Sequence, residues 1–458
     1  MKELLDVAVV GAGPAGLGTA HFARKRGLRT AVFEAGPKPG GKIQTRREDG
    51  FVIESGPQAW EDREPALKEV VRDLELEPLR ANPASSSRYL LLNGRLHAVP
   101  MGPVSFLASP ILSVRAKLRL LGEPFRRGRK DREDESVHDF AARRLGPEVA
   151  RILVDAIVSG IYAGDTTRIS AGAAFPMLVE LEREHGSLVR GMIARRKAAR
   201  RSPEPKDGQP ELTRALYSFA GGMGDLVAAL ARELGAALHL SSPVARLRRE
   251  GEAWVLEGSG SELGRAREVV LSTPARTTAA ILAPLCPELE GMAARFPVNG
   301  MATVMAAFPR SRVAHPCSGF GFLAPRCEGF APLGVVFVHD IFPRHVPEGF
   351  VALRVMLGGA HDPDVAGLSD EELVDKALGS VRLLLGLRGE PARVWTGRVP
   401  HAVPQYTLGH LERVARFEAG VARWEGLHLA GDSFFGVGVL PAFRRAAEVA
   451  GQFRSGKG

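Results

Sequence analysis

Apolar and glycine-rich segments alternate at the start of the chain. An apolar run at Asp6–Val10 leads into a glycine-rich turn at 11–16 and an alanine-rich stretch to about Arg26, and the following Gly27 is a residue type that commonly ends a helix. A second run, Arg29–Phe33, stops at Glu34. This order predicts strand, turn, helix and strand, which is the βαβ unit of a nucleotide-binding domain.

Two long segments show other patterns. From about Met101 to Arg200, apolar residues recur at helical spacing among many arginines, and the basic, proline-containing stretch Arg195–Gln209 is typical of a mobile, exposed loop. From Met301 to Gly358, short apolar runs separated by Gly and Pro predict a mostly antiparallel sheet. Between these segments we expect a helix at Asp225–Leu234, followed by short strands at Leu238–Leu240, Val244–Arg249 and Ala253–Glu257 and a buried strand that ends at 269–274.

The C-terminal region repeats the order strand, glycine turn and helix. Leu427–Leu429 is apolar, 431–438 is rich in glycine, and the spacing from Pro441 to about Phe453 is helical. We therefore expect the two nucleotide-type segments to meet in one domain, which is discontinuous in the sequence.

Composition indicates a compact globular protein. The chain has 458 residues, of which 45% are hydrophobic and 25% charged, and its length predicts two or three domains. The 61 Lys and Arg against 52 Asp and Glu give a net charge of +9, which favours an anionic membrane surface or a substrate with carboxylates. No nucleic-acid-binding motif accompanies this charge, so nucleic acid is not an expected partner.

Cysteine usage and the N-terminus favour the cytoplasm. Cys286, Cys317 and Cys327 include no closely spaced pair, which argues against a disulfide framework or a zinc site and fits a reducing compartment. No metal site is expected. The N-terminus lacks the successive segments of a secretory signal. No apolar run reaches the roughly 18 residues of a spanning helix, so any membrane contact should be peripheral.

The first glycine turn carries the dinucleotide fingerprint G-x-G-x-x-G. Its residues are Gly11, Gly13, Pro14, Ala15 and Gly16. Such glycines let the backbone approach a pyrophosphate at the N-terminus of a helix. Glu34 lies where an acid binds a ribose 2′-hydroxyl, which disfavours NADP. The fingerprint alone leaves FAD and NAD open.

Three further segments favour FAD. Pro39–Lys42 and Glu54–Pro57 are tight, glycine-bearing turns along which an extended cofactor can lie. Ala430–Asp432 supplies a carboxylate for a polyol. The glycines at 436–438 precede a helix whose N-terminus would stabilise a reduced, anionic flavin.

With these segments the chain resembles the flavin-containing amine oxidase superfamily, whose members carry the fingerprint, a Gly-Gly-Arg or Gly-Gly-Lys turn and an Ala-Gly-Asp segment. Lys42 stands where many members have Arg, which keeps the charge but loses a bidentate contact. Over essentially the whole chain the sequence is more similar to the protoporphyrinogen/coproporphyrinogen oxidase family. The segments that carry this resemblance are Glu54–Pro57, Ser87–Tyr89, Gly160–Asp165, Ala174–Pro176, Gly319–Pro325 and Phe342–Pro343.

The resemblance implies a reaction and a fold. The reaction is oxidation of protoporphyrinogen IX to protoporphyrin IX, with six electrons removed in three FAD cycles and molecular oxygen reduced to hydrogen peroxide. The fold is α/β, with a Rossmann-like FAD-binding domain of the amine-oxidase and glutathione-reductase type, a mixed, mostly antiparallel substrate domain and a helical, membrane-facing domain. The expected bounds are 1–80, 219–296 and 401–458 for the first domain, 81–100 and 297–400 for the second, and 101–218 for the third.

The resemblance also implies site residues. Arg88 is expected to bind a propionate of the tetrapyrrole substrate, since arginine suits a charge-assisted pair with a carboxylate. Leu323, Val336 and Met356 are expected to pack on the macrocycle, with the backbone of Ala163 on its other side. The expected cofactor-binding residues are Gly11, Gly13, Pro14, Ala15, Gly16, Glu34, Gly41, Lys42, Gly56, Pro57, Val244, Asp432, Val437, Gly438 and Val439.

Several alternatives stay open. The second candidate substrate is coproporphyrinogen III, and further candidates are another FAD-dependent amine oxidase or desaturase and a flavin-binding protein without catalysis. Val99–Phe125 fits either an amphipathic surface that docks on the inner face of the cell membrane or an ordinary helical core with a basic face. A homodimer is one candidate assembly. No general base is identified among His315, His339, His345, His361 and His401.

Overall fold

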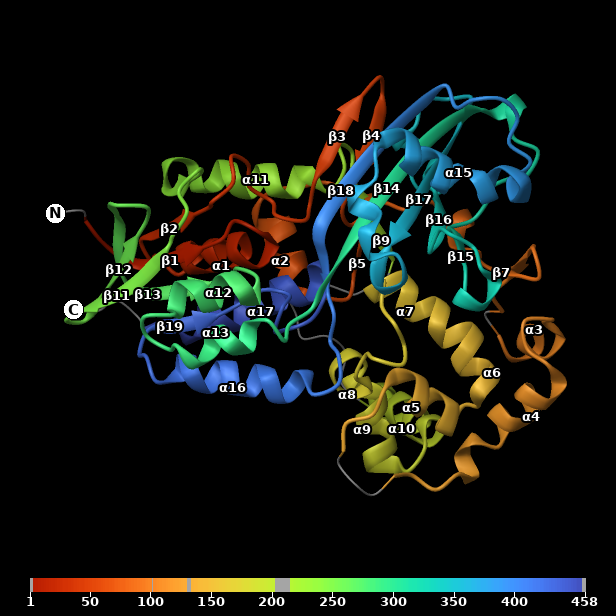
Figure 1. Cartoon of the computed structure of the whole chain (residues 1–458), viewed down its shortest axis with the longest axis horizontal. Coiled ribbons are helices and arrows are strands. Elements are labelled where there is room, and N and C mark those ends of the chain that lie inside the picture. Colours follow the sequence, from red (N-terminus) through yellow and green to blue (C-terminus); the bar gives the residue numbers. More distant parts are fainter. Residues whose placement is uncertain (1–2, 101, 130–132, 202–214, 455–458) are drawn as a thin grey trace. The chain divides into compact units, whose positions relative to one another are not determined.

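The computed structural model describes residues 3–100, 102–129, 133–201 and 215–454 (Figure 1). The chain divides into two compact units, each assembled from segments that lie far apart in the sequence. The first unit comprises Met1–Ala81, Pro210–Pro297 and Glu412–Gly458, and the second comprises Asn82–Gln209 and Val298–Leu411.

A seven-stranded sheet organises the first unit, with the order β10-β2-β1-β13-β12-β11 and β19 paired to β13. The strands are β1 (Leu4–Val10), β2 (Thr30–Phe33), β10 (Leu238–His239), β11 (Arg246–Glu250), β12 (Ala253–Glu257), β13 (Glu262–Leu271) and β19 (Leu427–Leu429). Strands β10, β2, β1, β13 and β19 pair with one another in parallel, whereas β12 pairs antiparallel with both β13 and β11.

Helices cover both faces of this sheet, which explains why its central strand is apolar at every position of its second half. Val7 and Val9 pack toward α1 (Pro14–Lys25), α11 (Gly224–Leu234) and α17 (Val439–Gln452). Ala8 and Val10 point to the other face, toward α12 (Ala275–Leu282), α13 (Glu288–Ala293) and α16 (His410–Ala422). A parallel strand buried on both sides has this continuous apolar pattern.

Shorter elements complete the first unit. A β3–β4 hairpin (Thr45–Glu48 and Phe51–Glu54) follows the second predicted turn. Strands β5 (Trp60–Glu61), β9 (Leu216–Phe219) and β6 (Pro78–Arg80) form a small antiparallel sheet, and α2 (Pro65–Asp73) lies between β5 and β6 in the chain.

A second seven-stranded sheet organises the other unit, in the order β18-β14-β17-β16-β15-β7-β8. Neighbouring strands in this sheet are antiparallel, except for β15 and β7, which are parallel. One face of this sheet packs on α15 (Asp370–Leu385). The strands are β7 (Arg88–Leu92), β8 (Arg95–Ala98), β14 (Val298–Pro309), β15 (Gly321–Leu323), β16 (Gly334–Phe337), β17 (Phe350–Gly358) and β18 (Arg393–Pro404), and the short helix α14 (Val338–Ile341) follows β16.

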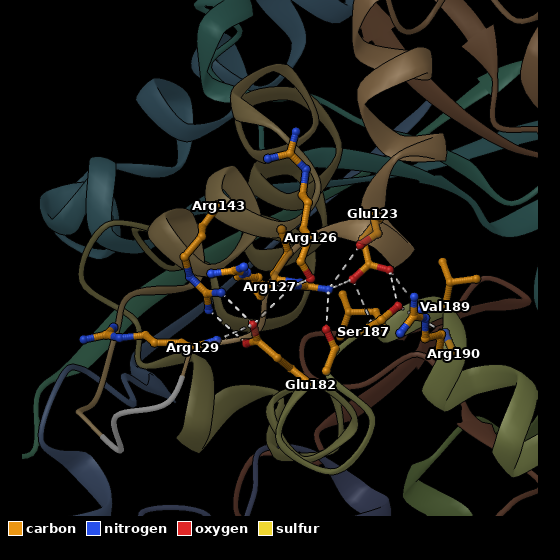
Figure 2. A network of polar contacts seen from close by, with 12 residues as sticks. Glu123, Arg126, Arg127, Arg129, Arg143, Glu182, Ser187, Val189 and Arg190 are labelled. Carbon is orange, nitrogen blue, oxygen red and sulfur yellow. Dashed lines mark hydrogen bonds and ion pairs between the residues drawn. The ribbon is translucent and has the colours of Figure 1, made fainter.

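The helical part of the second unit is held by a buried charge network (Figure 2). Arg144 and Glu123 are fully buried and form an ion pair, and Glu123 also accepts hydrogen bonds from the Ser187 hydroxyl (2.6 Å) and the Leu188 amide (2.9 Å) at the start of α10. The helices are α3 (Pro103–Ala108), α4 (Val114–Leu121), α5 (Val137–Arg144), α6 (Pro147–Val149), α7 (Asp155–Tyr162), α8 (Ala171–Ala174), α9 (Pro176–His185) and α10 (Leu188–Arg201), with a π-helical turn at Ala150–Val154.

The α/β fold, the opening βαβ unit and the mostly antiparallel second sheet are confirmed, but some bounds were wrong. Helix α10 occupies 195–201, where a loop was expected, and 202–209 lies outside the described residues. Residues 401–411, expected in the FAD-binding domain, belong to the second unit, because β18 ends at Pro404 and the Gly409 amide donates to Asp134 of the same unit (2.8 Å).

The helical segment 101–218, predicted as a third domain, does not form a separate unit. Its helices pack on Leu90 and Leu92 of the second sheet, so they share a unit with that sheet. The predicted C-terminal bound of this segment, residue 218, was wrong, because β9 (Leu216–Phe219) pairs with β5 and β6 of the first unit. In the part of the chain that the structure describes, every helix is too short or too polar to cross a lipid bilayer.

Candidate functional site

The three glycines of the fingerprint have different roles in the first unit. A Cβ atom on Gly16 would lie 1.9 Å from the Gly11 carbonyl oxygen, and Gly11 itself has φ +100° and packs on Ser272. The fold therefore requires glycine at both positions. Gly13 has an ordinary φ of −75°, and a Cβ atom there would meet nothing within 4 Å. The protein alone does not explain Gly13, whereas a ligand lying against the backbone at that point does.

Glu34 ties this turn to the loop that contains Val244. Its carboxylate accepts hydrogen bonds from the Ala12 amide (2.7 Å) and the Gly36 amide (2.8 Å), and its main-chain carbonyl accepts from the Ser242 amide (2.8 Å). Val244 is buried and precedes β11, so its predicted place at the start of a strand was wrong. The structure thus brings Glu34 and the Val244 loop together, as adenosine binding at this edge would require.

The second and third predicted turns meet each other. A Cβ on Gly56 would lie 1.8 Å from the Lys42 carbonyl oxygen, and one on Gly41 would lie 3.1 Å from the Cα of Gly13. Pro57, next in the chain, is half-buried. The Lys42 ammonium lies 2.5 Å from a carboxylate oxygen of Asp432, which joins the N-terminal turns to the C-terminal segment. These contacts gather the expected cofactor residues from both ends of the chain.

Glu54 has a structural role that the sequence did not suggest. Its buried carboxylate accepts hydrogen bonds from the Met223 amide (2.6 Å) and the Thr45 hydroxyl (2.8 Å), at the start of α11. A Cβ on Gly222 would lie 2.5 Å from the same carboxylate. Glu54 therefore caps a helix, and the glycines that precede α11 make room for it.

Helices α1, α2, α12 and α17 of the first unit begin without a side-chain cap or an acidic residue in the first turn. Two of these helices follow glycine turns that are expected to bind the cofactor. They are α1, after Gly13, and α17, after Gly438. Gly438 is exposed with φ +109°, between the half-buried Val437 and the buried Val439. Uncapped helix N-termini carry partial positive charge and free amides, which suit a pyrophosphate and an electron-rich flavin ring. With the open backbone at Gly13, these residues fit FAD.

The predicted substrate residues share one face of the second sheet. Arg88 pairs with Gly321, and Gly321 pairs with Val336 across the next strands. Leu323 lies two residues after Gly321, and Met356 pairs with Gly334, two residues before Val336. Paired residues, and residues two apart on a strand, point to the same face. The opposite face holds the core that packs on α15.

Arg88 is exposed on this face. Its guanidinium lies 5.2 Å from the centre of the Phe320 ring. No described acidic side chain forms an ion pair with it, so its charge is available for a carboxylate. Val336 is buried, and Leu323 and Met356 are half-buried. The face therefore combines a cation with aliphatic side chains.

The segment from Gly160 to Asp165 makes a sharp turn at the end of α7. Ala163 is buried in the left-handed region (φ 46°), and its carbonyl accepts hydrogen bonds from the Ala360 amide (2.8 Å) and the Asn299 side chain (3.0 Å). Tyr162 donates to the Ala174 carbonyl (3.2 Å), and burial raises the pKa of this phenol to about 12. The Ala163 main chain is thus held inside the fold, and its contact with a substrate stays a prediction.

Three half-buried histidines of the second unit, His315, His339 and His361, have lowered pKa values. Burial, followed by the charge of Arg326, lowers the pKa of His361, and burial also lowers the pKa of His339. Burial therefore favours the neutral form of each imidazole. On α7, burial raises the pKa of Asp155, whose carboxylate accepts from the Arg326 amide (2.8 Å). These groups lie among structural contacts, and none is assigned as a general base.

Comparison with known proteins gives matches over nearly the whole chain. The model of the family described as flavin containing amine oxidoreductase matches residues 14–452. The coproporphyrinogen III oxidase of Bacillus subtilis (strain 168) is 30% identical over 453 residues, covering 94% of this chain and 94% of that protein. The chloroplastic protoporphyrinogen oxidase of Oryza sativa subsp. japonica is 31% identical over 479 residues, covering 98% of this chain and 88% of that protein. A solved structure from Exiguobacterium sp. 255-15 has a TM-score of 0.80 at 26% identity, and covers 98% of this chain and 99% of that chain.

Proposed function

The chain belongs to the family of flavin-containing amine oxidoreductases, and from that premise we propose that it oxidises a porphyrinogen to the corresponding porphyrin. It is an FAD-dependent oxidoreductase, and both relatives described above are named for porphyrinogen oxidation. The proposed reaction removes six electrons in three cycles and passes them to molecular oxygen, giving hydrogen peroxide.

The observation that carries the proposal is the common sheet face of Arg88, Leu323, Val336 and Met356. These residues come from four strands, and only the registers of those strands place them together. The face carries the exposed Arg88, the buried Arg354, which pairs with Val336, and several aliphatic side chains, a combination that matches the chemistry of a porphyrinogen. The tetrapyrrole ring itself is uncharged and largely apolar, and the only charges of the substrate are on its carboxylates.

Each group would have a distinct task. Arg88 would bind a propionate through a charge-assisted hydrogen bond and orient the ring. Val336, Met356 and Leu323 would exclude water from the macrocycle, and bound FAD supplies the two-electron acceptor of each cycle. A protein base is not required, because the pyrrole nitrogens of the substrate can release the protons.

Two substrates are candidates. Protoporphyrinogen IX is the prediction from the sequence, and the rice relative carries that name. Coproporphyrinogen III, with four carboxylates in place of two, is the second candidate, and the Bacillus relative carries that name.

Anaerobic mixing of the holoprotein with each porphyrinogen separates these outcomes. Reduction of the flavin bleaches its absorbance, and porphyrin fluorescence should develop after oxygen is admitted. Faster bleaching by protoporphyrinogen IX would support the first substrate, and faster bleaching by coproporphyrinogen III the second. If neither bleached the flavin, the proposed function would be wrong.

We also propose that α3, α4 and the 3-10 turn that follows them (Glu123–Phe125) dock on an anionic membrane. Val104 is 82% exposed and Phe125 is 84% exposed, and Arg115 and Arg127 lie in the same segment. Exposed aliphatic and aromatic groups beside arginines are typical of a helix that lies in a lipid interface. Co-sedimentation with vesicles that contain phosphatidylglycerol should weaken when Phe125 is changed to Glu. If the wild-type protein and the Phe125→Glu variant sedimented equally with the vesicles, this surface would be excluded as the membrane-binding surface.

A further inference from the structure

Helix α7 has one buried and one exposed face. Asp155, Val158, Ser159 and Tyr162 are buried, whereas Ile157 is 46% exposed and Ile161 is 48% exposed. The two isoleucines are one helical turn apart, so their side chains are neighbours on the helix surface. Single exposed aliphatic side chains are common on protein surfaces, but an exposed pair beside a proposed substrate-binding face indicates an extension of that face.

The exposed pair continues the predicted substrate face. A Cβ atom on Gly160, between the two isoleucines, would lie 3.1 Å from both methyl carbons of Leu323. The same Leu323 side chain covers Gly334 on the neighbouring strand, where a Cβ would lie 2.9 Å from it. Leu323 therefore spans the space between the sheet and α7.

The hydrophobic cluster beside Leu323 also places α7 against this face of the sheet. Ala156 of α7 packs with Leu90, which lies two residues after Arg88 and points to the same face of the sheet. Helix α7 thus lies over the face that carries Arg88, Val336 and Met356, and α15 lies over the other. Ile157 and Ile161 are exposed on the helix that borders the predicted substrate face.

We propose that Ile157 and Ile161 form an aliphatic wall that contacts the porphyrinogen macrocycle. This inference rests on the proposed function and extends it to two residues outside the sheet. The occupant is a macrocycle, because the pair is continuous with Leu323 and because the nearby cation, Arg88, is complementary to the carboxylates of that substrate. Because Gly160 has no side chain, Leu323 packs directly against α7 beside the two isoleucines.

Glutamine variants test the wall. Ile157→Gln and Ile161→Gln replace an aliphatic side chain with a polar one that favours a helix, and both sites are about half exposed, so the fold and the flavin content should be unchanged. Each change should raise KM and weaken porphyrin product binding about fivefold, and the pair together on the order of 20-fold, with kcat nearly constant. Product binding, followed by quenching of porphyrin fluorescence, is a readout independent of turnover.

Leu383→Gln is the matched control. Leu383 is 89% exposed on α15, which covers the opposite face of the same sheet. This variant should keep the wild-type KM and product affinity. An equal loss in Leu383→Gln would show a general effect of lost surface aliphatics and would overturn the inference.

The remaining outcomes separate the wall from the proposed function. If the wild-type protein oxidises a porphyrinogen and both isoleucine variants keep its KM and product affinity, the wall is wrong and the proposed function stands. If the wild-type protein neither oxidises nor binds either tetrapyrrole, the proposed function fails and the wall with it. If the isoleucine variants lose vesicle binding and keep porphyrin affinity, the pair belongs to a lipid surface and the inference is overturned.

Discussion

Gly13→Ala should reduce FAD affinity without unfolding the protein. Gly13 is the N-cap of α1 with φ −75° and ψ 178°, a conformation open to alanine, and the new Cβ would meet no protein atom within 4 Å. Two small effects on stability oppose each other. Loss of backbone freedom in the unfolded chain stabilises by about 0.4–1 kcal/mol. Alanine is a poorer N-cap than glycine by about 0.5 kcal/mol. The net change in the free energy of unfolding should be within about 0.5 kcal/mol.

The methyl group would instead occupy the space where the fingerprint requires close approach to a pyrophosphate. A forced displacement of one methyl group costs roughly 1–3 kcal/mol, which corresponds to a loss in affinity of about 5- to 150-fold. Gly16→Ala is the contrasting variant, because its Cβ would lie 1.9 Å from the Gly11 carbonyl oxygen. It should destabilise the apoprotein by about 3 kcal/mol.

Flavin titration and urea unfolding of the two apoproteins separate these effects. FAD affinity is measured from the quenching of flavin fluorescence, and stability from the unfolding midpoint without flavin. The reasoning predicts an affinity defect with normal stability for Gly13→Ala, and a stability defect for Gly16→Ala. A Gly13→Ala protein that binds FAD as tightly as the wild type would refute the placement of the pyrophosphate at this turn.

Three further predictions concern the second unit. Arg144→Met should lower the free energy of unfolding by about 3 kcal/mol, because it leaves the buried Glu123 carboxylate without its ion-pair partner; a loss below about 1 kcal/mol in urea unfolding would contradict this. Burial raises the pKa of Glu123, but hydrogen bonds from Ser187 and Leu188 and the Arg144 contact outweigh it and hold the pKa below 4.5. The stability it contributes is therefore present above about pH 4.5 and lost as the pH falls through the folded-state pKa, and in Glu123→Gln this loss should disappear from unfolding curves measured across that range. Arg88→Met should raise the KM for a porphyrinogen by roughly 10- to 100-fold at unchanged flavin content, and an unchanged KM in steady-state assays would remove Arg88 from the substrate site.

The flavin-binding unit was largely predictable because its signals are local. The spacing of Gly11 and Gly16 defines a turn between a strand and a helix, and both positions are required by contacts within that turn. The sequence also predicted that the two nucleotide-type segments meet in one domain, but it did not predict which residues join them. The ion pair of Lys42 with Asp432 joins the two ends of the chain, and neither residue carries a local sign of the other.

The charged residues of the helical segment were the least predictable. A stretch with many arginines indicates a solvated basic surface, yet Arg144 is fully buried and pairs with Glu123. The difference lies in tertiary partners, because the Arg144 guanidinium also donates to the Gly186 carbonyl (3.1 Å) and the Glu123 carboxylate accepts from the start of α10 (Figure 2). A buried arginine is stable only when such acceptors surround it, and they lie on other helices.

The period of a β-strand explains why the substrate residues could be identified only through a resemblance. In β16 every position from Gly334 to Phe337 is buried, so the apolar pattern does not distinguish a core residue from one that faces a ligand. Val335 and Phe337 pack toward α15, whereas Val336 lies between them in the chain and points to the face of Arg88. Side chains alternate between the two faces of a strand, so residues that do not face the α15 core must contact something else. The first face packs on α15, and Leu90 and Leu92 of the second face pack on the helical segment; the macrocycle is the partner proposed for the rest of the second face.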